Sequence, residues 1–132
     1  MSTKGNFNPL GEVLGVSEVT TTTYTFVLAD KGKYIRFSNA NPQFITVPPN
    51  SSVAFPVNSV ITFEQAGAGS VVVQAGAGVT VNTYEGYMTQ GQYAAAQLVK
   101  KATNTWTLIG TITSDVTTTT TTPEGTTTTT TP

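Results

Sequence analysis

The carboxylates that could do acid–base chemistry in this sequence are scattered, form no close pair in the sequence and are not accompanied by a histidine. They are Glu12, Glu18, Asp30, Glu64, Glu85, Asp115 and Glu124, and the chain contains neither histidine nor cysteine. Without those two residue types the usual general base near neutral pH, thiolate nucleophiles and the commonest metal ligands are missing. A glycosidase with two carboxylates would have to be assembled from distant positions. The sequence therefore predicts a protein that is not an enzyme and has no metal or other cofactor.

The low charge narrows the class of partner, and the length limits the number of domains. Charged residues are 10% of the 132 residues and the formal net charge is -1, so no bulk attraction to nucleic acid or to an anionic membrane is expected. The length suits one domain with a core. No signal peptide and no run of about 18 apolar residues is evident, which predicts a protein made in the cytoplasm.

Three tyrosines, Tyr84, Tyr87 and Tyr93, surround Glu85 and Gly86. With the neighbouring amides, these rings could stack on a sugar. They could instead lie in a subunit interface, where tyrosine is enriched, and this interpretation is preferred. Trp106 is predicted to anchor the core. Lys100 and Lys101 are interpreted as a solvated strand end.

Short segments rich in β-branched and aromatic residues predict strands at Thr20–Leu28, Tyr34–Phe37, Val60–Glu64 and Trp106–Ile112. The first two, on either side of a turn at 30–33, predict a hairpin. Alanines make 91–101 ambiguous between helix and strand, and strand is preferred. With Gly, Pro and Asn between them, these segments predict an all-β fold, an antiparallel β-sandwich or small barrel of jelly-roll type.

One internal repeat is evident. Gln65-Ala66-Gly67-Ala68-Gly69 recurs as Gln74-Ala75-Gly76-Ala77-Gly78, and each copy precedes a short run of β-branched residues. Glycine permits tight turns and close backbone approach, so the repeat predicts two turns that join short strands. A phosphate-binding loop is rejected because no helix carrying Lys and Ser or Thr follows.

The composition divides the chain into three parts: an N-terminal arm or edge element (1–19), a β-sandwich domain (20–115) and a threonine-rich arm (116–132). In the last part, Thr117–Thr122 and Thr126–Thr131 are runs of six threonines separated by Pro123-Glu124-Gly125. This threonine arm cannot form a core of its own. It is interpreted as a disordered linker, a flexible tail, or an arm that adds a strand to a neighbouring subunit, and the last is favoured.

From Tyr24 to Ile112 the chain resembles a small β domain found in structural proteins of tailed bacteriophages. The resemblance lies in five segments: Val47-Pro48-Pro49, Gln65–Gly69, Gly78–Asn82, Gly91–Lys100 and Trp106–Gly110. It implies a virion protein of the head, neck or tail that forms a homo-oligomer such as a trimer. It implies no catalytic residue.

Two functions follow as expectations. The first is a capsid decoration or cement protein in the virion that binds the major capsid protein or neighbouring copies. The second is a tail-fibre or receptor-binding module that recognises a host surface glycan. The expected partner-binding residues come from both arms and the tyrosine group: Phe7, Leu10, Val13, Leu14, Tyr84, Tyr87, Thr117, Thr122, Thr126 and Thr131.

Overall fold

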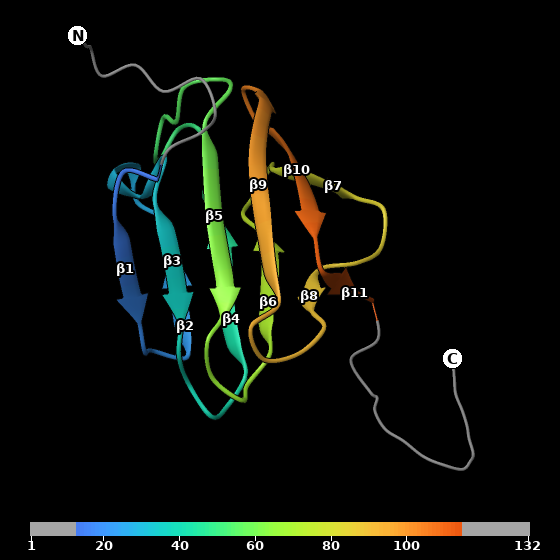
Figure 1. Ribbon diagram of the computed structural model, residues 1–132. Helices are drawn as coiled ribbons and strands as arrows, with labels where there is room; N and C mark the ends of the chain where they lie inside the picture. The colour runs from blue at the N-terminus through green and yellow to red at the C-terminus, as the bar shows by residue number, and fades with distance from the viewer. Residues whose placement is uncertain (1–12, 115–132) are drawn as a thin grey trace, which may run out of the picture.

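The computed structural model describes residues 13–114, which form two stacked β-sheets (Figure 1). The front sheet has the order β1 (Val16–Val19), β3 (Tyr34–Phe37), β5 (Val60–Gln65), β9 (Ala95–Ala102), β10 (Thr105–Gly110) and β7 (Thr80–Thr83). The back sheet has the order β11 (Ile112–Thr113), β8 (Met88–Thr89), β6 (Val71–Ala75), β4 (Gln43–Val47) and β2 (Thr23–Thr25). One 3-10 turn, η1 (Leu28–Asp30), follows β2. The expected all-β class is confirmed.

The first six strands wind as a short β-solenoid. The chain passes from the front sheet to the back sheet three times, so that β1, β3 and β5 pair in parallel in front and β2, β4 and β6 pair in parallel behind. Each coil therefore stacks on the one before it, with like positions in register. The predicted antiparallel β-sandwich or small barrel of jelly-roll type is not confirmed, and the antiparallel arrangement is wrong for these strands. Neighbouring strands of one sheet are separated in the chain by a strand of the other sheet, so they run in the same direction.

The remaining strands close the far end of the solenoid in a different way. β9 runs antiparallel to β5, and β10 runs antiparallel to β9. In the back sheet β8 is antiparallel to both β6 and β11, while β7 pairs with β10 in parallel at the edge of the front sheet. The antiparallel prediction thus holds only in part of this half of the molecule.

The core lies between the sheets and is built from the alternate residues that face inward. Phe26, Phe37 and Phe63 are completely buried, and their rings meet edge to face in sequence across the coils. Trp106 is 1% exposed and packs edge to face on Phe55, with ring centroids 5.4 Å apart. The prediction that Trp106 anchors the core is confirmed.

The two copies of the glycine repeat form the turns on either side of β6, as predicted. Gly67 and Gly69 donate backbone hydrogen bonds to Phe37 and Asn39 of the preceding coil, and Gly76 donates to Val47. A Cβ on any of these glycines would lie within 2.7 Å of the backbone beneath it. The glycines are therefore required because successive turns of the solenoid stack backbone on backbone.

The structure confirms some of the predicted strand segments and only part of another. Val60–Glu64 is confirmed within β5, the strand in 91–101 corresponds to β9, and Trp106–Ile112 spans β10 and the start of β11. The segment Thr20–Leu28 is a strand only at β2 and continues into η1. The predicted hairpin is wrong, because β2 and β3 belong to different sheets.

Candidate interaction surfaces

The start of the solenoid presents two sheet edges at the same side of the molecule. β1 ends the front sheet and β2 ends the back sheet, and no other strand of the described chain pairs with their outer sides (Figure 1). We call these two strands the open end. An uncovered strand edge presents backbone N–H and C=O groups that another chain can pair with. β1 consists of the last four residues of the segment expected to be an N-terminal arm or edge element.

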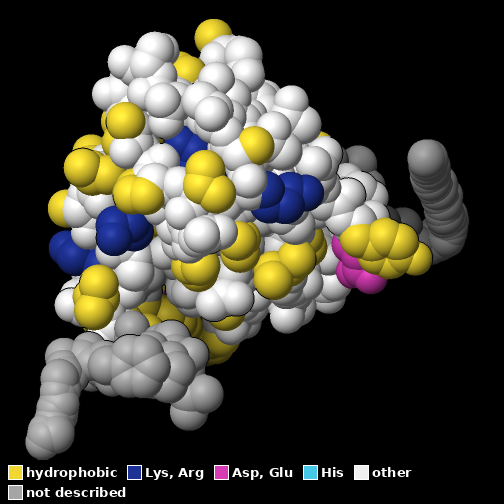
Figure 2. Space-filling view, turned by 90° about the horizontal axis from the view of Figure 1, so that it is seen from above, with side chains coloured by type: hydrophobic (Ala, Val, Ile, Leu, Met, Phe, Trp, Pro, Cys, Tyr) yellow, Lys and Arg dark blue, Asp and Glu magenta, His cyan; other side chains and the backbone are white. Residues whose placement is uncertain are grey.

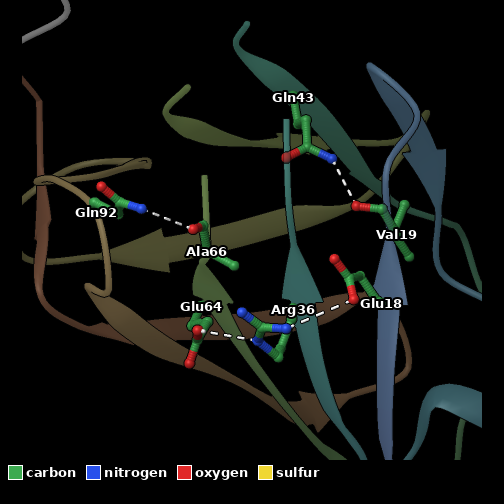
Figure 3. Close-up of polar contacts among 7 residues, drawn as sticks. All are labelled: Glu18, Val19, Arg36, Gln43, Glu64, Ala66 and Gln92. Atoms are coloured by element: carbon green, nitrogen blue, oxygen red, sulfur yellow. Dashed lines mark hydrogen bonds and ion pairs between the residues drawn. The ribbon is translucent and has the colours of Figure 1, made fainter. Parts of the chain in front are cut away.

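A buried glutamine holds this open end in shape. The side-chain amide of Gln43, at the start of β4, donates to the carbonyl of Val19 at 3.0 Å (Figure 3) and to that of Thr21 at 2.9 Å. Asn39 adds a hydrogen bond to the carbonyl of Thr20 at 2.7 Å. The turn between β1 and β2 is thereby fixed to the second coil, so the two outer strands keep their relative position.

The outer face of the front sheet carries a ladder of alternating charge. Glu18, Arg36 and Glu64 are register partners on β1, β3 and β5. Arg36 lies 3.5 Å from a carboxylate oxygen of Glu18 and 3.4 Å from one of Glu64 (Figure 3). Asp30, by contrast, is buried and accepts hydrogen bonds from the Tyr24 hydroxyl at 2.8 Å and the Val27 N–H at 2.9 Å. Glu18, Arg36 and Glu64 therefore link three successive coils, whereas Asp30 fixes the connection from β2 to η1.

Tyr34 adds a pH-dependent contact to this ladder, because its hydroxyl donates to Glu64. Burial, followed by that hydrogen bond, raises the pKa of Tyr34 to about 12. The unfolded phenol loses its proton near pH 10, so the stability that Tyr34 contributes is complete below about pH 10 and is lost as pH rises toward about 12.

We therefore expect Tyr34→Phe to reduce the loss of stability between about pH 9 and about pH 11.5. The free energy of unfolding in urea at the two pH values measures it. Tyr84→Phe is the control, since Tyr84 is 97% exposed. Equal losses in Tyr34→Phe and the parent chain would contradict the assignment.

One end of the molecule combines exposed apolar and basic side chains. It is the end at which β1, β3 and β5 begin and β9 finishes. The apolar side chains there, 48–70% exposed, are Leu14, Val27, Leu28 and Val57. The basic side chains there are Lys31, Lys33 and Lys101. Figure 2 shows this end, with acidic side chains only at one rim. Within residues 13–114 no carboxylate lies at ion-pair distance from these three lysines.

The tyrosines are exposed but occupy two different loops. Tyr84 and Tyr87 lie between β7 and β8, where Tyr84 is 97% and Tyr87 45% exposed, and the Tyr87 hydroxyl donates to the carbonyl of Val81 at 2.9 Å. Tyr93 lies between β8 and β9 with a φ of 71° and is 68% exposed. Only Tyr84 therefore offers nearly its whole ring to a partner.

Lys100 is not solvated, and that prediction is wrong. It is 2% exposed, because its side chain projects inward from β9 in phase with Leu98. Its ammonium group donates to the side-chain oxygen of Asn50 at 2.8 Å and to the carbonyl of Phe55 at 2.7 Å, and lies 5.9 Å from the Trp106 ring centroid. Burial lowers the pKa of Lys100. Lys101 is exposed, as expected.

The other expected partner-binding residues fall into two groups. Val13 and Leu14 are 43% and 70% exposed, just before β1. The residues outside the described part of the chain are Phe7, Leu10, Thr117, Thr122, Thr126 and Thr131. The sequence predicted an arm or edge element in 1–19, which contains β1, but not that β2 forms a second edge beside it, since edge position depends on how distant strands pair.

Between residues 13 and 114 no group of three or more metal-ligating side chains comes together, and no helix is long and apolar enough to cross a bilayer. Comparison with known proteins found no matching family model, no matching curated protein and no matching solved structure.

Proposed function

We propose that this chain is a structural protein of a bacteriophage particle, a capsid decoration or cement protein that stabilises the head through contacts between subunits. The observation that carries the proposal is the open end, where each sheet finishes in a strand whose outer edge pairs with no other strand between residues 13 and 114. Such a pair of edges suits a protein that works by joining its neighbours, the major capsid protein or other copies of itself.

Three of the four carboxylates between residues 13 and 114 have partners within the fold, which supports a role without catalysis; the fourth, Glu85, is exposed in the β7–β8 loop. Glu18 and Glu64 are both paired with Arg36, and Asp30 is buried and hydrogen-bonded. These groups are engaged in holding the fold. The location in the virion is proposed from the resemblance to β domains of phage structural proteins, which lies in turn and strand segments of the sequence.

The proposal is tested with particles that carry the chain ending at Ser114, which retains both sheets. We expect heads that carry the shortened chain, or lack the protein, to release their contents at lower temperature than the parent, with adsorption to host cells unchanged. Heat release of DNA, followed with an intercalating dye, is the measurement. The proposal would be overturned if heads with the shortened chain, or without the protein, kept the heat resistance of the parent. It would also be overturned if the protein were not found in parent particles.

A second candidate function is a receptor-binding module of the tail, and one observation favours it. Tyr84 exposes 97% of its surface beside Glu85 in the β7–β8 loop, which is the kind of exposed ring on which a sugar stacks. If this function holds, Tyr84→Ala lowers adsorption to host cells without changing the heat resistance of the heads. The cement proposal expects neither change from Tyr84→Ala.

A further inference from the structure

We propose that the threonine arm of one copy lies on the open end of a second copy and adds one strand to each of its sheets. The inference rests on the proposed function in one respect, that the protein acts by contact with its neighbours. It adds the identity of the partner, a second copy of this chain, and the surface that this partner occupies.

The hydrogen bonds of β1 show which of its backbone groups are available. The N–H groups of Tyr34 and Ser38 donate to the carbonyls of Gly15 and Val19. Because alternate residues of a strand direct their backbone groups to opposite sides, the groups of Val16 and Glu18 point away from β3. Val16 is 69% exposed, so its side chain leaves this edge accessible.

β2 presents a matching edge behind it. The N–H of Phe44 donates to Thr22, and the N–H of Phe26 donates to Thr46. The backbone groups of Thr23 and Thr25 therefore point away from β4. The carbonyl of Thr23 accepts a local hydrogen bond from the Thr21 hydroxyl at 2.7 Å, which leaves its N–H and both groups of Thr25 directed outward.

The threonine arm has the layout of one more coil. In the first coil, three residues, 20–22, separate β1 from β2. In the arm, Pro123-Glu124-Gly125 separates two runs of six threonines, and each run is longer than the strand it would cover. Threonine favours extended backbone, and proline with glycine favours a turn. Pairing through the backbone needs no specific side chains, which suits a run of one residue type.

The position of the chain end favours a second copy as the donor, because an arm that returned to its own open end would use about six extended residues to cross the sheet. β11, which closes the described chain, lies at the edge of the back sheet opposite β2 (Figure 1). With neighbouring strands about 4.8 Å apart, the two edges of this five-stranded sheet are about 19 Å from one another. In a head-to-tail arrangement, the β11 edge of one copy faces the open end of the next copy, so the arm begins beside the strands that it would pair with. Such a contact is heterologous and builds rings or fibres.

Two blocked variants of the full chain test the inference. The donor-only variant combines Val16→Pro with Thr25→Pro, which removes an outward N–H from each edge strand, where proline is tolerated. The acceptor-only variant replaces Thr118, Thr120, Thr127 and Thr129 with proline. The matched controls carry alanine at positions 16 and 25, or valine at the four arm positions.

We expect the parent chain and both controls to form oligomers in light scattering after gel filtration, and each blocked variant to remain a monomer of 13.8 kDa. Mixing the two blocked variants restores association as a one-to-one complex, because each supplies the half that the other lacks. A monomeric parent chain, an acceptor-only variant that still self-associates, or a mixture that stays monomeric would each overturn the inference.

A peptide of residues 116–132 provides a measurement that needs no edge variant, should the prolines at positions 16 and 25 unfold the domain. We expect it to dissociate the oligomer of the parent chain, while the same peptide with four prolines does not. Failure to dissociate the oligomer counts against the inference. All these measurements use the isolated protein, so their outcome is separate from whether the protein occurs on a phage head.

Discussion

Replacing Lys100 with alanine is expected to destabilise the protein by about 3 kcal/mol, because it leaves one buried and one partly buried acceptor without a donor and opens a cavity. The acceptors are the side-chain oxygen of Asn50 and the carbonyl of Phe55, both in the connection from β4 to β5. Lys100→Met keeps most of the packing but not the hydrogen bonds, so we expect an intermediate loss.

The neighbouring residue supplies the control for this experiment. Lys101 is exposed on the same strand, and Lys101→Ala is expected to change the free energy of unfolding by no more than about 0.5 kcal/mol. Urea unfolding measures the stability. Trp106, the single tryptophan, lies beside the ammonium group and reports local loosening by a red shift of its fluorescence. Equal stability of Lys100→Ala and Lys101→Ala would show that the buried contacts contribute nothing.

The second large effect is expected from Gly69→Ala. A Cβ at this position would lie 1.9 Å from the carbonyl oxygen of Asn41 and 2.2 Å from its carbonyl carbon. Backbone atoms cannot swing aside as a flexible side chain can, so the turn at 39–42 must move away from the next coil. We expect a loss of about 3 kcal/mol or more, at the upper end of what overpacking costs.

Two other glycines make this a graded test. Gly91 has open space and no positive φ, so Gly91→Ala is expected to be neutral or slightly stabilising. Gly78 also has open space but a φ of +76°, so Gly78→Ala should cost about 1 kcal/mol through backbone strain. Midpoints of urea unfolding should rank the three in the order Gly69, Gly78, Gly91 from largest to smallest loss. If Gly69→Ala were no worse than Gly78→Ala, the close stacking of the turns would be refuted.

Local pattern predicted the strands well and their pairing poorly. Alternation identified the inward face of β10, where Trp106 and Leu108 are buried while Ile109 is 49% exposed. The same alternation places Lys100 in phase with the buried Leu98. Lysine is rarely buried, however, so the residue type predicts an exposed side chain at this position. Gln43 is likewise in phase with the buried Ile45 and Val47, but its hydrogen-bond partners could not be predicted, because they lie in the preceding coil.

Pairing could not be predicted because it joins segments that are distant in sequence. The turn between Thr20–Leu28 and Tyr34–Phe37 favours a hairpin, yet η1 directs the chain from the back sheet to the front. The glycine repeat was correctly interpreted as two turns, but the backbone that each turn rests on becomes evident only when the coils stack. Parallel and antiparallel arrangements also use the same short β-branched strands, so composition does not separate them.

The parallel pairing of β7 with β10 has a consequence for how the molecule is built during synthesis. The second and third coils each find their template already in place when they leave the ribosome, since β3 docks on β1 and β5 on β3. β7 has no such template, because its partner in the front sheet is β10, which is made later. We therefore expect the solenoid to grow in the order of translation, while β7 waits as an unpaired segment until β10 has docked on β9.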